Sequence, residues 1–181
     1  MSGFRVNKSV NSAGYAGLLQ RAYIPSSNSK LIAPGDLIVF SGAGDSKGTR
    51  GAVRASSSGV VAGVVAGIDV ESENNINSIG LAASTAGYVD FIDHPDAEFI
   101  VDTTATLNDE DIGLNANATF TDSTSAGGIV TSGMKLDSST KATTATLQFR
   151  IVGLAEDDDG VLGNRAIVRL NNVSRTNTTG A

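Results

Sequence analysis

The apolar residues of this chain fall in short runs that are repeatedly interrupted by turn-forming residues. Leu37–Phe40 and Ile129–Thr131 have the length of single strands, and glycine, asparagine, aspartate or proline lies close to most such runs. Several short strands spaced by turns are typical of an antiparallel sandwich or barrel. The pattern therefore predicts an all-β fold, an antiparallel β-sandwich or barrel-like body, with an extended N-terminal arm and one short helix.

The composition agrees with this class. Tryptophan and cysteine are absent and aromatic residues make up only 5% of the 181 residues, so a core must rest on valine, isoleucine, leucine and alanine. Small and β-branched residues favour strands and turns over long helices. Without cysteine there is no disulfide framework and no thiolate zinc site.

The clearest strand pattern covers residues 144–152. Leu147, Phe149 and Ile151 alternate there with Gln148 and Arg150, which predicts one buried face and one solvated face. A turn at 94–96 makes residues 98–102 the expected hairpin partner of 86–92. The short helix is expected at 106–113. The remaining predicted strands cover residues 37–40, 53–55, 60–70, 117–121, 129–131 and 166–170. No internal repeat long enough for a solenoid or propeller is visible.

The chain divides by composition into an extended arm (1–30), a β-rich body (31–172) and a flexible C-terminal tail (173–181). The arm is polar with scattered apolar side chains, and such a segment can dock into a neighbour's groove or sheet edge. The alternative is a frayed end followed by a first strand. The predicted interface residues of the arm are Phe4, Tyr15, Leu18, Leu19, Tyr23 and Ile24.

Residues suited to catalysis are few. The single histidine, His94, lies between Asp93 and Pro95, and a neighbouring strand residue cannot readily orient its imidazole as a base. Residues 42–49 look like a phosphate-binding loop, but Lys47 precedes Gly48 and a strand follows instead of a helix. We expect no catalytic residues and no cofactor.

Charge points away from nucleic acid and leaves one candidate metal site. The net charge is −6, and no stretch has the apolar length of a membrane span. The acidic turn Asp157–Asp159 offers oxygen ligands for a hard cation, although a hydrated hairpin tip is the favoured reading. We therefore expect no bound metal, and whether this turn binds a cation stays open.

Two stretches carry a family resemblance: Asp-Ile-Gly-Leu-Asn-Ala at 111–116 and Leu-Asp-Ser-Ser-Thr at 136–140. With the order of segments over residues 14–172, they resemble the structural cement, or head decoration, proteins of tailed bacteriophages. The resemblance implies a β-rich protein, often a trimer, that binds the outside of the capsid shell and clamps neighbouring capsid subunits. It implies no catalytic residues.

The expected function is therefore capsid decoration by a virion protein that is not an enzyme. Its expected partners are the major capsid protein and further copies of itself, as a homotrimer, with no nucleic acid and no membrane. Its expected location is the outer surface of the capsid, after a soluble stage in the host cytoplasm. The alternatives are another virion component, such as a tail or fibre module, or a carbohydrate-binding β-sandwich.

Overall fold

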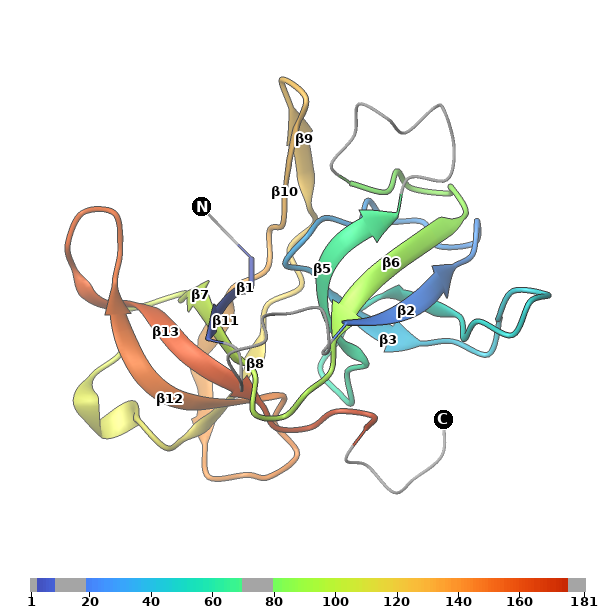
Figure 1. The fold of residues 1–181 in the computed structure, drawn as a ribbon. Helices are drawn as coiled ribbons and strands as arrows, with labels where there is room; N and C mark the ends of the chain where they lie inside the picture. Colours follow the sequence, from blue (N-terminus) through green and yellow to red (C-terminus); the bar gives the residue numbers. More distant parts are fainter. Residues whose placement is uncertain (1–2, 9–18, 70–79, 176–181) are drawn as a thin grey trace.

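The computed structural model describes residues 3–8, 19–69 and 80–175 (Figure 1). Their strands pair antiparallel in a six-stranded, a five-stranded and a two-stranded sheet, which confirms the all-β prediction. The elements are β1 (Arg5–Lys8), β2 (Leu19–Ile24), β3 (Leu37–Phe40), β4 (Ala52–Arg54), β5 (Gly63–Asp69), β6 (Gly87–Ile92), β7 (Glu98–Asp102), the 3-10 turn η3 (Asp109–Asp111), β8 (Asn115–Ala118), β9 (Thr124–Ala126), β10 (Ile129–Thr131), β11 (Leu136–Ala142), β12 (Phe149–Glu156) and β13 (Leu162–Leu170).

The five-stranded sheet curls into a small barrel, here called the first barrel. Its strand order is β2-β6-β5-β3-β4, and a parallel bridge between Tyr23 and Gly51 joins the two edges. The backbone NH of Tyr23 donates to the carbonyl of Arg50 at 2.9 Å across this closure. Apolar side chains that point inward, such as Ile38, Val65 and Phe91, form its core.

The six-stranded sheet forms the second barrel. Strands β7-β13-β12-β8-β11 follow one another, and a parallel bridge between Thr103 and Leu136 brings the last strand back to the end of the first. Strand β1 adds to the free side of β7. Phe99, Phe149 and Ile151 lie in its core with other apolar residues of the same strands.

The two barrels have the same topology. Counted within each barrel, the strands run in the order first, fifth, fourth, second and third, and the parallel bridge joins the first strand to the third. The turn before the second strand is also alike. The NH of Ala33 donates to the Asp36 carboxylate at 2.9 Å, and the NH of Asn108 donates to the Asp111 carboxylate at 2.9 Å. The chain therefore contains one barrel topology twice.

The barrels pack into one unit through an apolar face of the first barrel. Leu37, Val64 and Ile92 point away from their own core and belong to the buried cluster that fills the second barrel. Val64 lies opposite Ile92 on neighbouring strands, and the corresponding pair in the second barrel is Arg150 and Arg169. This outer face is therefore apolar in the first barrel, where the second barrel covers it. The corresponding face of the second barrel has two arginines instead. Figure 1 shows the two barrels side by side.

The predicted hairpin of residues 86–92 and 98–102 is wrong. Strand β6 pairs with β2 and β5 in the first barrel, whereas β7 pairs with β1 and β13 in the second. The turn that contains His94 is where the chain crosses from one barrel to the other. His94 Nδ1 accepts the NH of Asp96 at 3.2 Å and so helps to shape this connection.

The alternation is confirmed for Phe149, Arg150 and Ile151 but not for Leu147 and Gln148, which precede the strand, and Leu147 is only partly buried. Phe149 and Ile151 are buried and Arg150 is exposed, but Gln148 is buried too. Strand β12 begins only at Phe149, so Gln148 is not part of the alternating pattern. Its side-chain oxygen accepts the NH of Ala118 at 3.0 Å, which ties the start of β12 to β8.

The short helix is present as the single turn η3. Asn108 is its N-cap residue, and Gly113 follows it with a φ of +95°, a left-handed conformation that favours glycine. The side chain of Asp111 is held within this turn by the capping-box contact and by Lys141 Nζ at 2.7 Å.

The described parts of the predicted arm and tail are built into the barrels. Strand β1 pairs with β7, and β2 pairs with β6 as a wall of the first barrel, so residues 3–8 and 19–24 do not form a separate extension. At the other end, Val173 is buried and bridges Val61. The remainder of the predicted tail, 176–181, lies outside the described residues.

Candidate functional site

The six predicted interface residues are distributed over different environments. Phe4 is only 2% exposed and its ring stacks on Phe149, with centroids 4.4 Å apart. Ile24 is fully buried in the core of the first barrel. These two side chains stabilise their own chain, which differs from the expectation that they dock into a neighbour.

The other four predicted interface residues leave that expectation untested. Leu19 is 37% exposed, and Tyr23 is half-buried with its ring 5.6 Å from that of Tyr88. Tyr15 and Leu18 lie outside the described residues. A contact of Leu19 or Tyr23 with another molecule stays a prediction.

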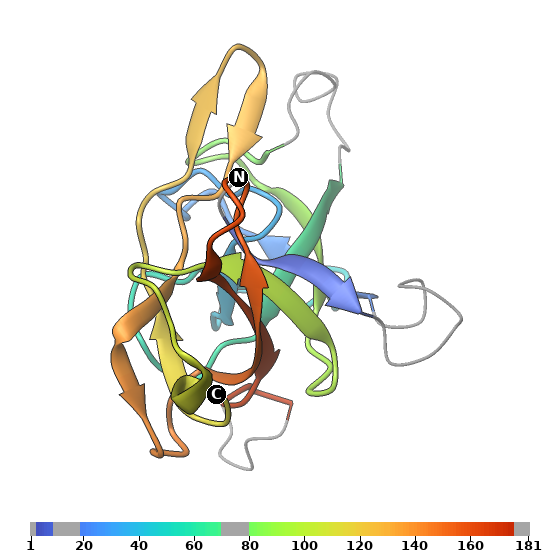
Figure 2. The same ribbon diagram turned by 90° about the vertical axis from the view of Figure 1, so that its left-hand side faces the viewer.

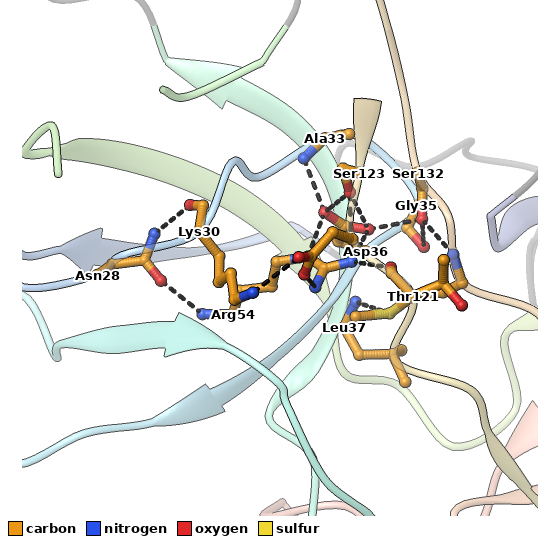
Figure 3. Close-up of polar contacts among 12 residues, drawn as sticks. Asn28, Lys30, Ala33, Gly35, Asp36, Leu37, Arg54, Thr121, Ser123 and Ser132 are labelled. Atoms are coloured by element: carbon orange, nitrogen blue, oxygen red, sulfur yellow. Dashed lines mark hydrogen bonds and ion pairs between the residues drawn. The ribbon is translucent and has the colours of Figure 1, made fainter. Parts of the chain in front are cut away.

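The main polar site of the structure is buried where the two barrels meet (Figure 3). Asp36, from the turn before β3, pairs with Arg54 at the end of β4, with Nε 2.9 Å from Oδ2. Both side chains are almost completely buried. Ser123 and Ser132 from the second barrel donate to the same carboxylate at 2.6 and 2.5 Å. We call these four residues the Asp36 cluster.

Arg54 extends the cluster further into the second barrel. Its Nη2 donates to the carbonyl of Thr121 at 2.6 Å, and Nη1 lies 3.5 Å from a carboxylate oxygen of Asp122. On the other side, the Asn28 side chain accepts the backbone NH of Arg54 at 3.2 Å. Asp36 and Thr121 thus hold the guanidinium from both barrels, and Asn28 holds the backbone of Arg54.

The geometry of the cluster suits a structural joint better than a reactive centre. The Asp36 carboxylate accepts hydrogen bonds from the NH of Ala33, two nitrogens of Arg54 and the two serine hydroxyls. These donors use the oxygen lone pairs that a general base or a metal ligand would need. A buried ion pair with all its hydrogen bonds made holds its neighbours in one arrangement.

A hairpin rises from this joint and projects from the body, as both views show (Figures 1 and 2). It consists of β9 and β10, joined by Gly127 and Gly128 with φ of 60° and 80°. Positive φ at both central residues is the signature of the tight turn that suits a two-residue hairpin. Ser123 precedes β9 and Ser132 follows β10, so the Asp36 cluster holds both legs of the hairpin at its base.

The acidic turn between β12 and β13 is organised by its own donors. One oxygen of Asp157 accepts the NH groups of Asp159 and Val161, and the other accepts the side chain of Asn164 at 2.6 Å. The hydrogen bond from Asn164 is the largest of the effects that lower the pKa of Asp157. Asp158 pairs with Arg165 at 2.8 Å, which lowers the pKa of Asp158 and raises that of Arg165. Among the described residues, no group of histidines and carboxylates is arranged to hold a metal ion.

Residues 42–49 fold around an internal carboxylate. Asp45 accepts the NH groups of Lys47 and Thr49 at 2.9 and 2.7 Å and the hydroxyl of Tyr88 at 2.8 Å. Together with the NH of Asp45, which donates to the carbonyl of Thr49 at 3.0 Å, three amides of this loop are therefore bonded within the chain. Desolvation raises the pKa of Asp45, but the hydrogen bonds from Thr49, Tyr88 and Lys47 outweigh it and lower the pKa to about 2.

This lowered pKa gives a pH prediction. Because the folded state holds Asp45 as a carboxylate below its ordinary pKa of 3.8, its stabilising effect is full above that value and is lost as the pH falls towards about 2. We expect the carboxyl carbon of Asp45 to titrate near pH 2 by NMR. We also expect Asp45→Asn to reduce the loss of melting temperature over this pH interval. A titration midpoint at or above 3.8 would contradict the loop geometry.

The remaining acidic candidates are engaged in ion pairs or turns. Glu98 pairs with Arg169 at 2.8 Å, and Glu110 lies in η3. No described helix has the length and apolarity to cross a membrane. The sequence analysis missed the Asp36 cluster, although the Pro-Gly-Asp turn and an arginine within the apolar run 52–55 are both visible in the sequence.

Comparison with known proteins identifies no relative. No protein-family model matches the chain, and no curated protein or solved structure matches it significantly. The class that the described residues define is an antiparallel all-β protein of two fused barrels, with a projecting hairpin held by a buried ion pair.

Proposed function

We propose that this chain is a capsid decoration, or cement, protein of a tailed bacteriophage. In this proposal it binds the outer surface of the head as a homo-oligomer and bridges neighbouring capsid subunits. The proposal starts from the resemblance carried by residues 111–116 and 136–140 and adds what the structure says about those residues.

The two resembling stretches are neighbours in the second barrel. The first leads from η3 into β8, the second opens β11, and these two strands pair, with Leu136 opposite Ala118. The NH of Asn117 donates to the hydroxyl of Thr140 at 2.9 Å, and that hydroxyl donates to the carbonyl of Asp137 at 2.8 Å. The resemblance therefore falls on one connected structural unit, which supports a shared fold for this part of the chain.

One observation carries the functional side of the proposal: a hairpin is held out from the body, whereas three carboxylates of the candidate sites are hydrogen-bonded within the chain. Asp36, Asp45 and Asp157 each accept several hydrogen bonds within the chain. The β9–β10 hairpin, by contrast, is anchored at its base and exposed along β9. This arrangement suits binding between surfaces.

The proposed mechanism is differential binding. A ligand that binds only the assembled shell stabilises that state by mass action. Many copies on one shell also turn weak individual contacts into a large cumulative effect, because each bridging copy holds its second contact at high effective concentration. No chemical step is required.

The test uses heads of the phage that encodes the chain, assembled without it. We expect the purified protein to co-sediment with these heads at a saturating stoichiometry and to raise the temperature at which they break open. Heads already carrying the protein serve as the control, since they should take up none. Absence of co-sedimentation at both low and high salt would refute the proposal.

A further inference from the structure

The β9–β10 hairpin is too small to be stable by its own contacts. Each strand has three residues, all three residues of β9 are exposed, and Ile129 at the tip of β10 is 64% exposed. An isolated two-stranded hairpin is at best marginally stable in water. An exposed isoleucine on such an element gains free energy when another surface covers it.

The hairpin is nevertheless held in a defined position. Ser123 and Ser132 fix its two legs to Asp36, and the side chain of Val130 lies against Gly80 of the first barrel, where an added Cβ would collide with it. An element that is ordered before binding loses less conformational entropy when it binds. The base of the hairpin is thus built to present its tip.

Both edges of the hairpin have backbone groups that point outward. The tight turn places a hydrogen bond between Ala126 and Ile129, so the next pair, Ser125 and Val130, directs its NH and carbonyl groups away from the partner strand. In the described part of the chain, no third strand pairs with either edge. Open strand edges are templates for pairing with another chain.

The hairpin is uncharged in a chain that is acidic as a whole. The net charge of the chain is −6, so two copies repel each other on average. From Ser123 to Met134 there is no ionisable side chain, and this part of the surface can meet its own copy without like-charge repulsion. We infer that the β9–β10 hairpin is a self-association element whose edges pair with the same hairpin in a second copy of this chain.

The geometry restricts the assemblies that can result. Pairing of the same edge in two copies gives a two-fold dimer. Pairing of β9 in one copy with β10 in the next gives a ring if the rotation between copies closes, and an open filament if it does not. The inference does not depend on the capsid role. If both hold, the hairpin supplies the homo-oligomer that the proposed function requires.

The experiment measures molar mass by light scattering during size-exclusion chromatography. We expect wild type to elute as an oligomer, and Ser125→Pro and Ile129→Lys to elute at the 18.4 kDa mass of one chain. Proline at 125 removes an outward NH, and lysine at 129 places like charges across the contact. Val161→Lys is the matched control, because Val161 is a 44% exposed apolar residue in a different turn, and it should keep the wild-type mass.

Salt and a second readout separate the possible outcomes. The oligomer should persist at high salt, because the contact contains no ion pair. Circular dichroism should show all three variants folded, since each substitution is at an exposed position. A monomeric wild type throughout the micromolar range would overturn the inference, as would an unchanged mass for both hairpin variants. So would a hairpin variant that keeps its mass and loses binding to heads, because the hairpin would then contact the shell.

Discussion

Arg54→Met is expected to lower the free energy of unfolding by about 3–5 kcal/mol, because it leaves the carboxylate of Asp36 buried without its cation. Both partners are almost fully buried, so water cannot replace the lost ion pair. The guanidinium also holds the carbonyl of Thr121, and that contact with the second barrel disappears with it. Equilibrium unfolding in urea measures the loss.

Two further variants make this prediction specific. Arg169 pairs with Glu98 at a similar distance but is 41% exposed, so Arg169→Met should cost only about 0–1 kcal/mol. Replacing both partners, as Asp36→Leu with Arg54→Met, should recover part of the stability, because neither buried charge remains. Equal losses for Arg54→Met and Arg169→Met would show that the buried pair does not lock the barrels together.

Phe149→Ala is expected to cost about 3–5 kcal/mol, the range for truncating a buried phenylalanine. Phe149 lies opposite Leu170 on β13 and Ala116 on β8, and its ring stacks on Phe4. Removing the ring opens a cavity at the centre of the second barrel and leaves Phe4 without its partner. Thermal and urea unfolding should both show the loss.

The conservative variant and a double-mutant cycle provide the controls. Phe149→Leu should cost less than Phe149→Ala, because most of the apolar volume stays in place. The effects of Phe4→Ala and Phe149→Ala should not add, since the two rings contact each other. Unchanged melting of Phe149→Ala would place Phe149 outside the core, and additive effects would contradict its contact with Phe4.

Local patterns in the sequence predicted most strands but not their partners. Runs such as Leu37–Phe40 and Glu98–Asp102 match strands β3 and β7, because an apolar run between turns has few alternatives. The pairing of strands depends on contacts between residues far apart in the sequence. The turn at His94 therefore predicted a hairpin, whereas in the structure the chain crosses there from the first barrel to the second. Two strands that follow one another usually pair, and here the duplicated topology overrides that tendency.

The duplication was hidden because it is a repeat of topology and not of residues. The one local signal is an apolar residue followed four positions later by aspartate, as in Ile32 with Asp36 and Leu107 with Asp111. Both aspartates accept a backbone NH in the turn before the second strand. The residues on the outer face differ between the two barrels, because this face must be apolar only in the first barrel, where the second barrel covers it.

The Asp36 cluster could not be derived from the sequence for a different reason. Ser123 and Ser132 lie 87 and 96 residues from Asp36, and isolated serines in a Gly- and Thr-rich segment look like loop residues. Only tertiary packing brings them to the carboxylate. The predicted arm failed in the same way for Phe4, because a single aromatic side chain in a polar stretch has no periodicity that reveals its burial.

The joint connects the fold to the proposed surface role. If the buried pair fixes the legs of the hairpin, loosening it should weaken self-association before it unfolds the barrels. Hydrogen exchange of Arg54→Met should then increase first at Ser123 and Ser132. The position of the hairpin, which lies between two strands of the second barrel, would then depend on Arg54 of the first barrel.

In the proposed function, this molecule coats a phage head through repeated surface contacts. An electron-microscopy map of the intact virion tests it most directly. We expect density for the double barrel on the outer face of the head, in ordered copies that bridge adjacent shell subunits. A head with no such density, or the double barrel located only on the tail, would contradict it.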